Sequence, residues 1–150
     1  SKRVSKEEVK KTFTMDQDWL FWRGSDGSGV SKQTNLPDIL SLDDESLLWS
    51  HEIQGGGVPV IAGGRAYQFG YYGVEEELEE ALVCFDAASG EVLWERTHSD
   101  FISDIVYNRY GVGAASVDPA TGNVYFQTSP GLLIGYDSDG NKLWERSLME

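Results

Sequence analysis

The stretch Cys84–Arg96, CFDAASGEVLWER, is nearly repeated by Gly135–Arg146, GYDSDGNKLWER. Each copy has an apolar run, an Asp, a turn that contains Gly, and a second run that reaches a Trp. Asp and Gly favour tight turns, because the Asp side chain accepts hydrogen bonds from nearby backbone N–H groups and Gly adopts a positive φ without strain. Each copy therefore predicts two antiparallel strands joined by a short turn.

A third Trp extends the repeat toward the N-terminus. Trp49, in SLLWS, precedes Trp94 by 45 residues (94 − 49), and Trp94 precedes Trp144 by 50 (144 − 94). A period of roughly 40–50 residues with these marks is typical of the four-stranded blades of a β-propeller. We therefore predict an all-β fold, a β-propeller of four-stranded antiparallel blades. A closed propeller needs about 4–8 blades, so the propeller is incomplete in this chain, which supplies about two full blades and one outer strand.

The repeats also divide the chain. Residues 1–18 are polar, with basic residues clustered near the start, and are predicted to form an N-terminal arm; residues 19–150 form the propeller segment, with repeats at about 46–96 and 97–146. The apolar group Trp19–Trp22 is expected to anchor the arm to a sheet or to cover an open edge. An outer strand is expected at Ser46–Glu52, as part of a blade whose other strands lie elsewhere. The remaining strands are expected within the apolar segments 58–63, 65–72, 81–87, 91–96, 113–118, 123–129, 131–137 and 141–146.

The recurring Trp is expected to join neighbouring blades. A large planar side chain near the end of an outer strand can lie across the turn of the next blade, and an aromatic side chain buries on the order of 150–250 Å². The residues that mark the repeat are Trp49, Asp86, Gly90, Trp94, Asp137, Gly140 and Trp144.

These marks resemble a known repeat. FDAASGEVLW and YDSDGNKLW are similar to the A-x-D-x-x-T-G-K-x-x-W repeat of the PQQ-like, quinoprotein-type propellers, with Cys84 at the Ala position and a turn one residue shorter in the second copy. The opening WRGSDGSGVS also resembles PQQ-like repeat proteins secreted by bacteria. The resemblance covers residues 19–150 and implies a periplasmic or extracellular location. The family contains quinone- and calcium-dependent alcohol dehydrogenases, and an outer-membrane assembly lipoprotein that acts as a docking scaffold.

The same resemblance frames the functional alternatives. The enzymes of the family carry adjacent cysteines, a catalytic Asp with Glu and Asn calcium ligands, and a Trp under the quinone; this chain has one cysteine, and no catalytic, cofactor-binding or metal-binding residue can be assigned by motif. The first hypothesis is a non-catalytic extracytoplasmic segment that acts as a protein-binding scaffold or as part of a larger propeller. The alternative is the N-terminal part of a PQQ- and calcium-dependent dehydrogenase whose active site lies on further blades. A third is a carbohydrate-binding module that uses exposed aromatics: Tyr67, Tyr71, Tyr72 and Tyr107.

The charge and composition of the chain limit the classes of partner that it can bind. The net charge of −13 (25 acidic against 12 basic residues) argues against nucleic acid and against anionic membrane surfaces. No apolar run approaches the ~18 residues of a membrane span. The lone Cys84 excludes an internal disulfide and suits a small buried apolar side chain. The partner is expected to be another protein chain or further blades, because unpaired sheet edges promote aggregation unless they are covered.

The connection between the repeats holds the candidate contact residues. The stretch THSDFISDIVYNRYGVG, residues 97–113, is longer than a plain turn and mixes aromatic, amide and charged side chains, which suits recognition. The possible partner-binding residues are Asp100, Asp104, Tyr107, Asn108, Arg109 and Tyr110. Two other patterns are interpreted as structural. The Gly of DSDGN comes too early for a calcium loop, and adjacent residues His98–Asp100 cannot face one another as a catalytic triad.

Overall fold

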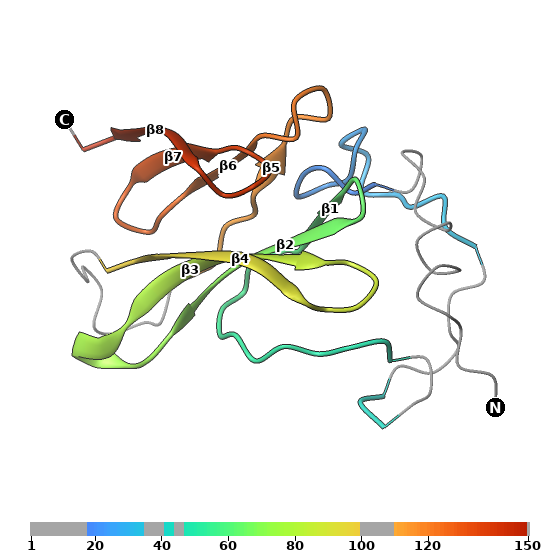
Figure 1. Cartoon of the computed structure of the whole chain (residues 1–150), viewed down its shortest axis with the longest axis horizontal. Helices are drawn as coiled ribbons and strands as arrows, with labels where there is room; N and C mark the ends of the chain where they lie inside the picture. Colours follow the sequence, from blue (N-terminus) through green and yellow to red (C-terminus); the bar gives the residue numbers. More distant parts are fainter. Residues whose placement is uncertain (1–17, 35–40, 44–46, 100–109, 150) are drawn as a thin grey trace.

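The computed structural model describes residues 18–34, 41–43, 47–99 and 110–149. They form two four-stranded antiparallel sheets in which each strand pairs with the next along the chain (Figure 1). Blade 1 contains β1 (Val60–Ala62), β2 (Arg65–Tyr72), β3 (Glu79–Asp86) and β4 (Val92–His98). Blade 2 contains β5 (Ser116–Val117), β6 (Val124–Gln127), β7 (Leu132–Tyr136) and β8 (Lys142–Ser147). One short 3-10 turn, η2 (Glu75–Glu77), lies between β2 and β3. The predicted all-β fold with four-stranded antiparallel blades is confirmed.

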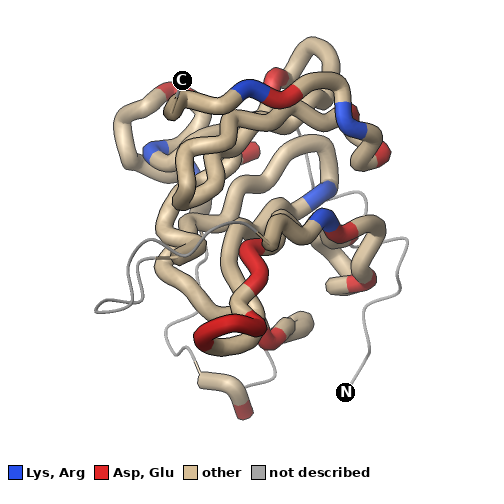
Figure 2. Tube along the Cα trace, turned by 90° about the vertical axis from the view of Figure 1, so that its left-hand side faces the viewer, with Lys and Arg blue, Asp and Glu red and all other residues tan. Residues whose placement is uncertain are grey.

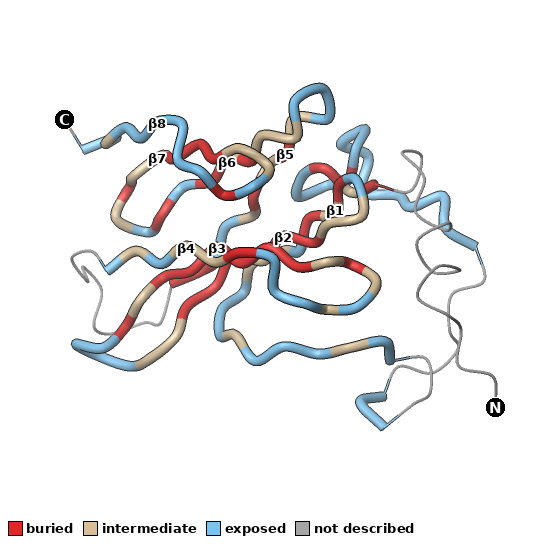
Figure 3. The backbone as a smooth tube through the Cα atoms, viewed as in Figure 1, coloured by how far each residue is buried: buried red, intermediate tan, exposed pale blue. Residues whose placement is uncertain are grey.

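The main core lies between the two sheets, which Figure 3 shows as buried segments facing each other. Alternate residues of β2 point the same way because side chains of a strand alternate between faces. Tyr67 and Phe69 therefore both face blade 2, where Phe69 meets Phe126 with ring centroids 5.2 Å apart. Leu82 and Ile134, from the third strands of the two blades, are fully buried in the same cluster.

The opposite face of blade 1 is also covered. Ala81, Val83 and Phe85 form a second cluster there, against which Trp49 and Ile53 pack. Blade 1 is thus covered on both faces by described residues, whereas the main core covers one face of blade 2.

The segment predicted as an outer strand has no strand partner among the described residues. Of the outer strand predicted at Ser46–Glu52, Ser46 lies outside the described residues, and residues 47–53 belong to no strand; Gln54 alone forms an isolated bridge, with Tyr71. A strand requires a hydrogen-bonding neighbour along its edge. Here the segment lies over the face of the sheet, so its backbone finds no ladder among the described residues.

The N-terminal segment pairs with the first strand of blade 1. Trp19 N–H donates to Ile61 O (2.8 Å) and Ile61 N–H to Trp19 O (2.9 Å), and Leu20 O accepts from Val117 N–H of blade 2 (3.1 Å). The prediction that the Trp19–Trp22 group covers an open edge is therefore confirmed for its first two residues. The arm predicted over residues 1–18 lies outside the described residues apart from Asp18.

Both blades contain a β-bulge at the same place. In blade 1 the β3–β4 pairing shifts register between Cys84 and Phe85, and Leu93 is the extra residue. In blade 2 the β7–β8 pairing shifts between Gly135 and Tyr136, with Leu143 as the extra residue.

Candidate interaction surface and inter-blade pocket

Trp94 joins blade 1 to blade 2. Its indole Nε1 donates to Ser138 O (2.9 Å) in the β7–β8 turn, and its ring centroid lies 6.0 Å from that of Tyr136. A Cβ on Gly140 would lie 2.7 Å from the indole, so only Gly leaves room for this contact. Arg96, two residues further along β4, donates from Nε to Gly140 O (2.8 Å).

Trp49 makes the same contacts one blade earlier. Its Nε1 donates to Ala87 O (2.9 Å) in the β3–β4 turn, and its ring centroid lies 5.2 Å from that of Phe85. A Cβ on Gly90 would lie 2.5 Å from its ring. Trp49 therefore occupies on blade 1 the position that Trp94 occupies on blade 2.

The turns that receive these tryptophans are shaped by their Asp residues. Asp86 Oδ1 accepts from the N–H groups of Ala88 (3.2 Å) and Ser89 (2.9 Å). Asp137 Oδ1 accepts from the backbone N–H of Asn141 (2.8 Å), and Asp137 Oδ2 accepts from the side-chain amide of Asn141 (2.9 Å). These bonds lower the pKa of the Asp137 carboxyl. Both Asp137 oxygens therefore stabilise the turn itself, as the sequence interpretation of DSDGN expected.

Trp144 belongs to a row of side chains across blade 2 that is equivalent to the row of Trp94 in blade 1. No turn of a following blade covers it among the described residues. In blade 1, Tyr67, Cys84 and Trp94 lie side by side across β2, β3 and β4, and this row faces blade 2. In blade 2 the corresponding row is Tyr125, Gly135 and Trp144.

This second row carries a partly exposed aromatic pair, Tyr125 and Trp144. Trp144 stacks on Tyr125 with centroids 5.8 Å apart and is 42% exposed, whereas Trp94 is 8% exposed. Leu143 and Leu148 of the same edge are also exposed. We call this set of side chains on blade 2 the outer face.

The predicted contact loop falls mostly outside the described residues. Asp100, Asp104, Tyr107, Asn108 and Arg109 are not described. Tyr110 is described and is buried with Tyr71 and Leu78. The partner-binding role of this loop stays a prediction.

A buried carboxylate next to that loop was missed by sequence reasoning. Glu80 is 3% exposed; it accepts from Gly111 N–H (3.0 Å) and Ser129 N–H (2.8 Å), and also from the Ser129 hydroxyl. It thereby links β3 of blade 1 to the β6–β7 turn of blade 2. In the sequence Glu80 is one of five glutamates within residues 75–80, and the other four gave that stretch the appearance of a solvated loop. Figure 2 shows the acidic residues, in red, gathered in this part of the chain.

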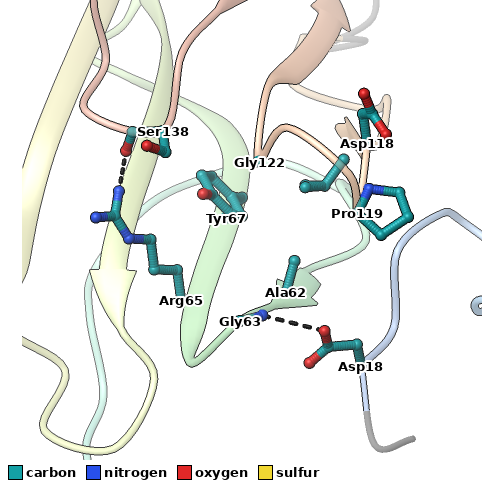
Figure 4. A pocket seen from close by; sticks show the side chains of 10 residues that line it. Asp18, Ala62, Gly63, Arg65, Tyr67, Asp118, Pro119, Gly122 and Ser138 are labelled. Carbon is teal, nitrogen blue, oxygen red and sulfur yellow. Dashed lines mark hydrogen bonds between the residues drawn. The ribbon is translucent and has the colours of Figure 1, made fainter. Parts of the chain in front are cut away.

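A small pocket lies where the two blades and the N-terminal segment meet (Figure 4). Its volume is about 180 Å³. Blade 1 contributes Ala62, Gly63, Arg65 and Tyr67; blade 2 contributes Val117, Asp118, Pro119, Gly122 and Ser138; the N-terminal segment contributes Asp18.

The described residues carry little of the chemistry of a catalytic centre. They include no group of three His, Cys, Asp or Glu side chains placed to hold a metal ion. His98 Nε2 lies 3.3 Å from the Tyr136 hydroxyl, while Ser99 Oγ donates to Glu79 Oε1 (2.6 Å), so these neighbours turn to different partners. Burial raises the pKa of the Cys84 thiol to about 11, which suits the predicted packing role.

The aromatic surface predicted for carbohydrate binding needs correction. Tyr67 is 2% exposed and Tyr71 is 7% exposed, because the alternation of β2 turns both side chains inward. Tyr72 is partly exposed and its hydroxyl meets His51 Nε2 at 3.0 Å; Tyr107 lies outside the described residues. The prediction of an exposed aromatic row is wrong for its first two members.

Comparison with known proteins identifies the class. The family model described as "Outer membrane protein assembly factor BamB", a PQQ-repeat family, matches residues 37–150. Since this match spans more than half of the chain, the protein belongs to this family of PQQ-like repeat propellers. A search of curated proteins finds no match.

A solved structure shares the fold. The quinohemoprotein alcohol dehydrogenase from Comamonas testosteroni is similar over 99% of this chain, with a TM-score of 0.56 and 20% sequence identity. The chain spans 22% of the length of that structure. This likeness shows a partial propeller of the PQQ type and, at that identity, the fold alone. The described residues contain no helix with the length and apolar character needed to cross a membrane.

Proposed function

We propose that this segment contributes two blades to a larger, extracytoplasmic propeller that acts as a non-catalytic protein-binding scaffold. The observation that carries the proposal is the unequal environment of three equivalent tryptophans. Trp49 and Trp94 each contact the turn of a following blade, whereas Trp144 lies on the outer face. A further blade seated on that face would give Trp144 the same contact.

The preceding side of the segment supports the same proposal. Residues 47–53 lie over blade 1 without strand partners among the described residues. The Trp49 ring packs directly against Gly90, as the Trp94 ring packs against Gly140. We propose that this stretch is the outer strand of a neighbouring blade whose other strands come from elsewhere in the assembly.

The scaffold role rests on two supports. The family model carries the name of an outer-membrane assembly factor, which also supports an extracytoplasmic location. The acidic charge of the whole chain further favours protein partners over nucleic acid.

The second candidate is part of a quinoprotein dehydrogenase. It is favoured by the likeness to a quinohemoprotein alcohol dehydrogenase, of which this chain would be the equivalent of about one fifth. On this reading, PQQ and calcium would bind to further blades, and the present residues would contribute packing alone.

Native mass spectrometry of the protein, purified from its own source without denaturation, separates these candidates. The scaffold proposal expects the mass of further polypeptide and no quinone. Added mass of a quinone and calcium, with a new visible absorbance, would establish the dehydrogenase. A bare chain of 16.7 kDa would be followed by amide hydrogen exchange of the same preparation. Exchange of residues 47–53 as fast as in an unpaired segment would then contradict the larger propeller.

A further inference from the structure

The inter-blade pocket contains a buried carboxylate with unused acceptor capacity. Asp18 is 8% exposed, and its Oδ2 accepts one hydrogen bond, from Gly63 N–H at 3.1 Å. No Lys, Arg or His of the described residues forms an ion pair with it. A carboxylate offers about four acceptor positions, so the donors of a ligand can use those that the Gly63 N–H leaves free.

The other charged groups of the pocket are already engaged. Arg65 donates to Ser138 O and pairs with Asp139 Oδ1 at 3.5 Å, so its guanidinium turns toward the β7–β8 turn (Figure 4). Asp118 accepts from Ala120 N–H (3.0 Å) and the Thr121 hydroxyl (2.7 Å) of its own turn. Of the two carboxylates that line the pocket, Asp18 is buried and Asp118 is partly exposed, so Asp18 is the charged group that we assign to the ligand.

The lining and volume of the inter-blade pocket indicate the size and polarity of the rest of the ligand. Ala62, Val117, Pro119 and the ring of Tyr67 give the pocket an apolar lining. Tyr67 is 2% exposed, and burial raises the pKa of its hydroxyl, which interacts with the Cys84 thiol. The volume of about 180 Å³ is below the ~300–1,000 Å³ of sites for drug-sized ligands, so the ligand must be small.

We propose that this pocket binds a primary ammonium group on a short aliphatic stem, with Asp18 as its counter-ion. An ammonium group has three donors, which suit the free Asp18 oxygen positions, and a methylene stem suits the apolar walls. A calcium ion fits less well, because it takes six to eight oxygen ligands. The ligand can be a free aliphatic amine or a lysine side chain of another protein. The proposal does not depend on the larger propeller.

The test uses the full chain labelled with ¹⁵N, with the Gly63 amide as the reporter. Three probes are titrated: n-butylammonium, the peptide acetyl-Ala-Lys-Ala-amide, and n-butanol as the neutral equivalent. We expect a saturable shift with n-butylammonium and a response at least about tenfold weaker with n-butanol, which is the ratio that one charge-assisted contact supplies. Binding of the peptide as well would identify lysine as a source; binding of the free amine alone would identify a small ligand.

Two variants of equal charge provide the control. Asp18→Asn should weaken n-butylammonium binding by about tenfold or more, while Asp43→Asn, at an exposed carboxylate outside the pocket, should leave it unchanged. Equal affinity for n-butanol and n-butylammonium in the unmodified protein would overturn the proposal, as would equal affinity of the two variants, or no saturable shift by about 20 mM ligand. If Asp18→Asn does not fold, the comparison of n-butylammonium with n-butanol on the unmodified protein still decides the proposal.

Discussion

Blade 1 and blade 2 carry the same sequence repeat and the same strand order, yet they differ in burial. In blade 1 six consecutive residues of β3 are buried, because its two faces are covered by blade 2 and by the Trp49 segment. In β7 of blade 2 three of five residues are buried. The tryptophans differ in the same way, with Trp94 at 8% and Trp144 at 42% exposure. The repeat sets the shape of a blade, whereas its neighbours decide how much of that blade is core.

The largest expected effect tests this difference directly. Trp94→Ala should lower the free energy of unfolding by about 3–5 kcal/mol, because it removes a large buried side chain. Trp144→Ala should cost about 1 kcal/mol, the size of the aromatic contact with Tyr125. Urea unfolding of the chain measures both.

If Trp94→Ala and Trp144→Ala lower the free energy of unfolding equally, the difference in burial between the two tryptophans has no energetic consequence. In a preparation that contains further blades, the cost of Trp144→Ala should rise toward that of Trp94→Ala. An unchanged small cost there would contradict the proposal that a blade covers the outer face.

The next effect concerns the turn that receives Trp94. Gly140 has a φ of 79° and its added Cβ would lie 2.7 Å from the indole. Gly140→Ala should therefore cost about 2–4 kcal/mol, from backbone strain and overpacking together. Gly122 is the matched control, since its φ is 74° but the nearest atom to an added Cβ is 3.4 Å away. Gly122→Ala should cost the strain alone, about 1–2 kcal/mol, and equal costs in thermal unfolding would refute the tryptophan contact.

A smaller effect is expected at the polar link between the blades. Glu80→Gln replaces one acceptor oxygen by a donor, so an N–H of Gly111 or Ser129 loses its partner, at about 1–3 kcal/mol. The exposed Glu76 provides the control, and Glu76→Gln should change the free energy of unfolding by less than about 0.5 kcal/mol. If both substitutions have the same effect, the Glu80 hydrogen bonds add nothing measurable to the contact between the two blades.

The smallest effect is expected at Cys84, which occupies in blade 1 the position of Gly135 in blade 2. Its raised pKa, about 11 against an ordinary 9.0, means that the fold favours the protonated thiol. The protonated thiol therefore adds to the free energy of unfolding at pH values below its ordinary pKa of 9.0. This stabilisation is lost as the pH rises through about 9 to 11. Near pH 8, a thiol reagent should label Cys84 only at the rate of unfolding, and fast labelling of the folded chain would contradict its burial.

The sequence predicted what depends on local pattern. Alternation and Asp–Gly turns placed both sheets, since these signals act over a few residues. Residues 47–53 have no strand partner among the described residues, because strand formation depends on a neighbour that local pattern does not reveal. The inward direction of Tyr67 and Tyr71 depends on which face of β2 meets blade 2. The roles of Glu80 and Asp18 depend on backbone groups more than thirty residues away, at Gly111 and Gly63, and no short motif marks them.

The paired bulges at Leu93 and Leu143 have a consequence for how such a chain can grow. In an alternating strand one added residue reverses the direction of every side chain beyond it, so the bulge fixes which way the final tryptophan points. Because each blade carries its own bulge, a duplicated copy arrives with its tryptophan already oriented toward the next copy. Deletion of Leu93 would reverse that orientation within one blade and leave the other correct. The 40–50-residue repeat is thus a self-contained module for tandem duplication.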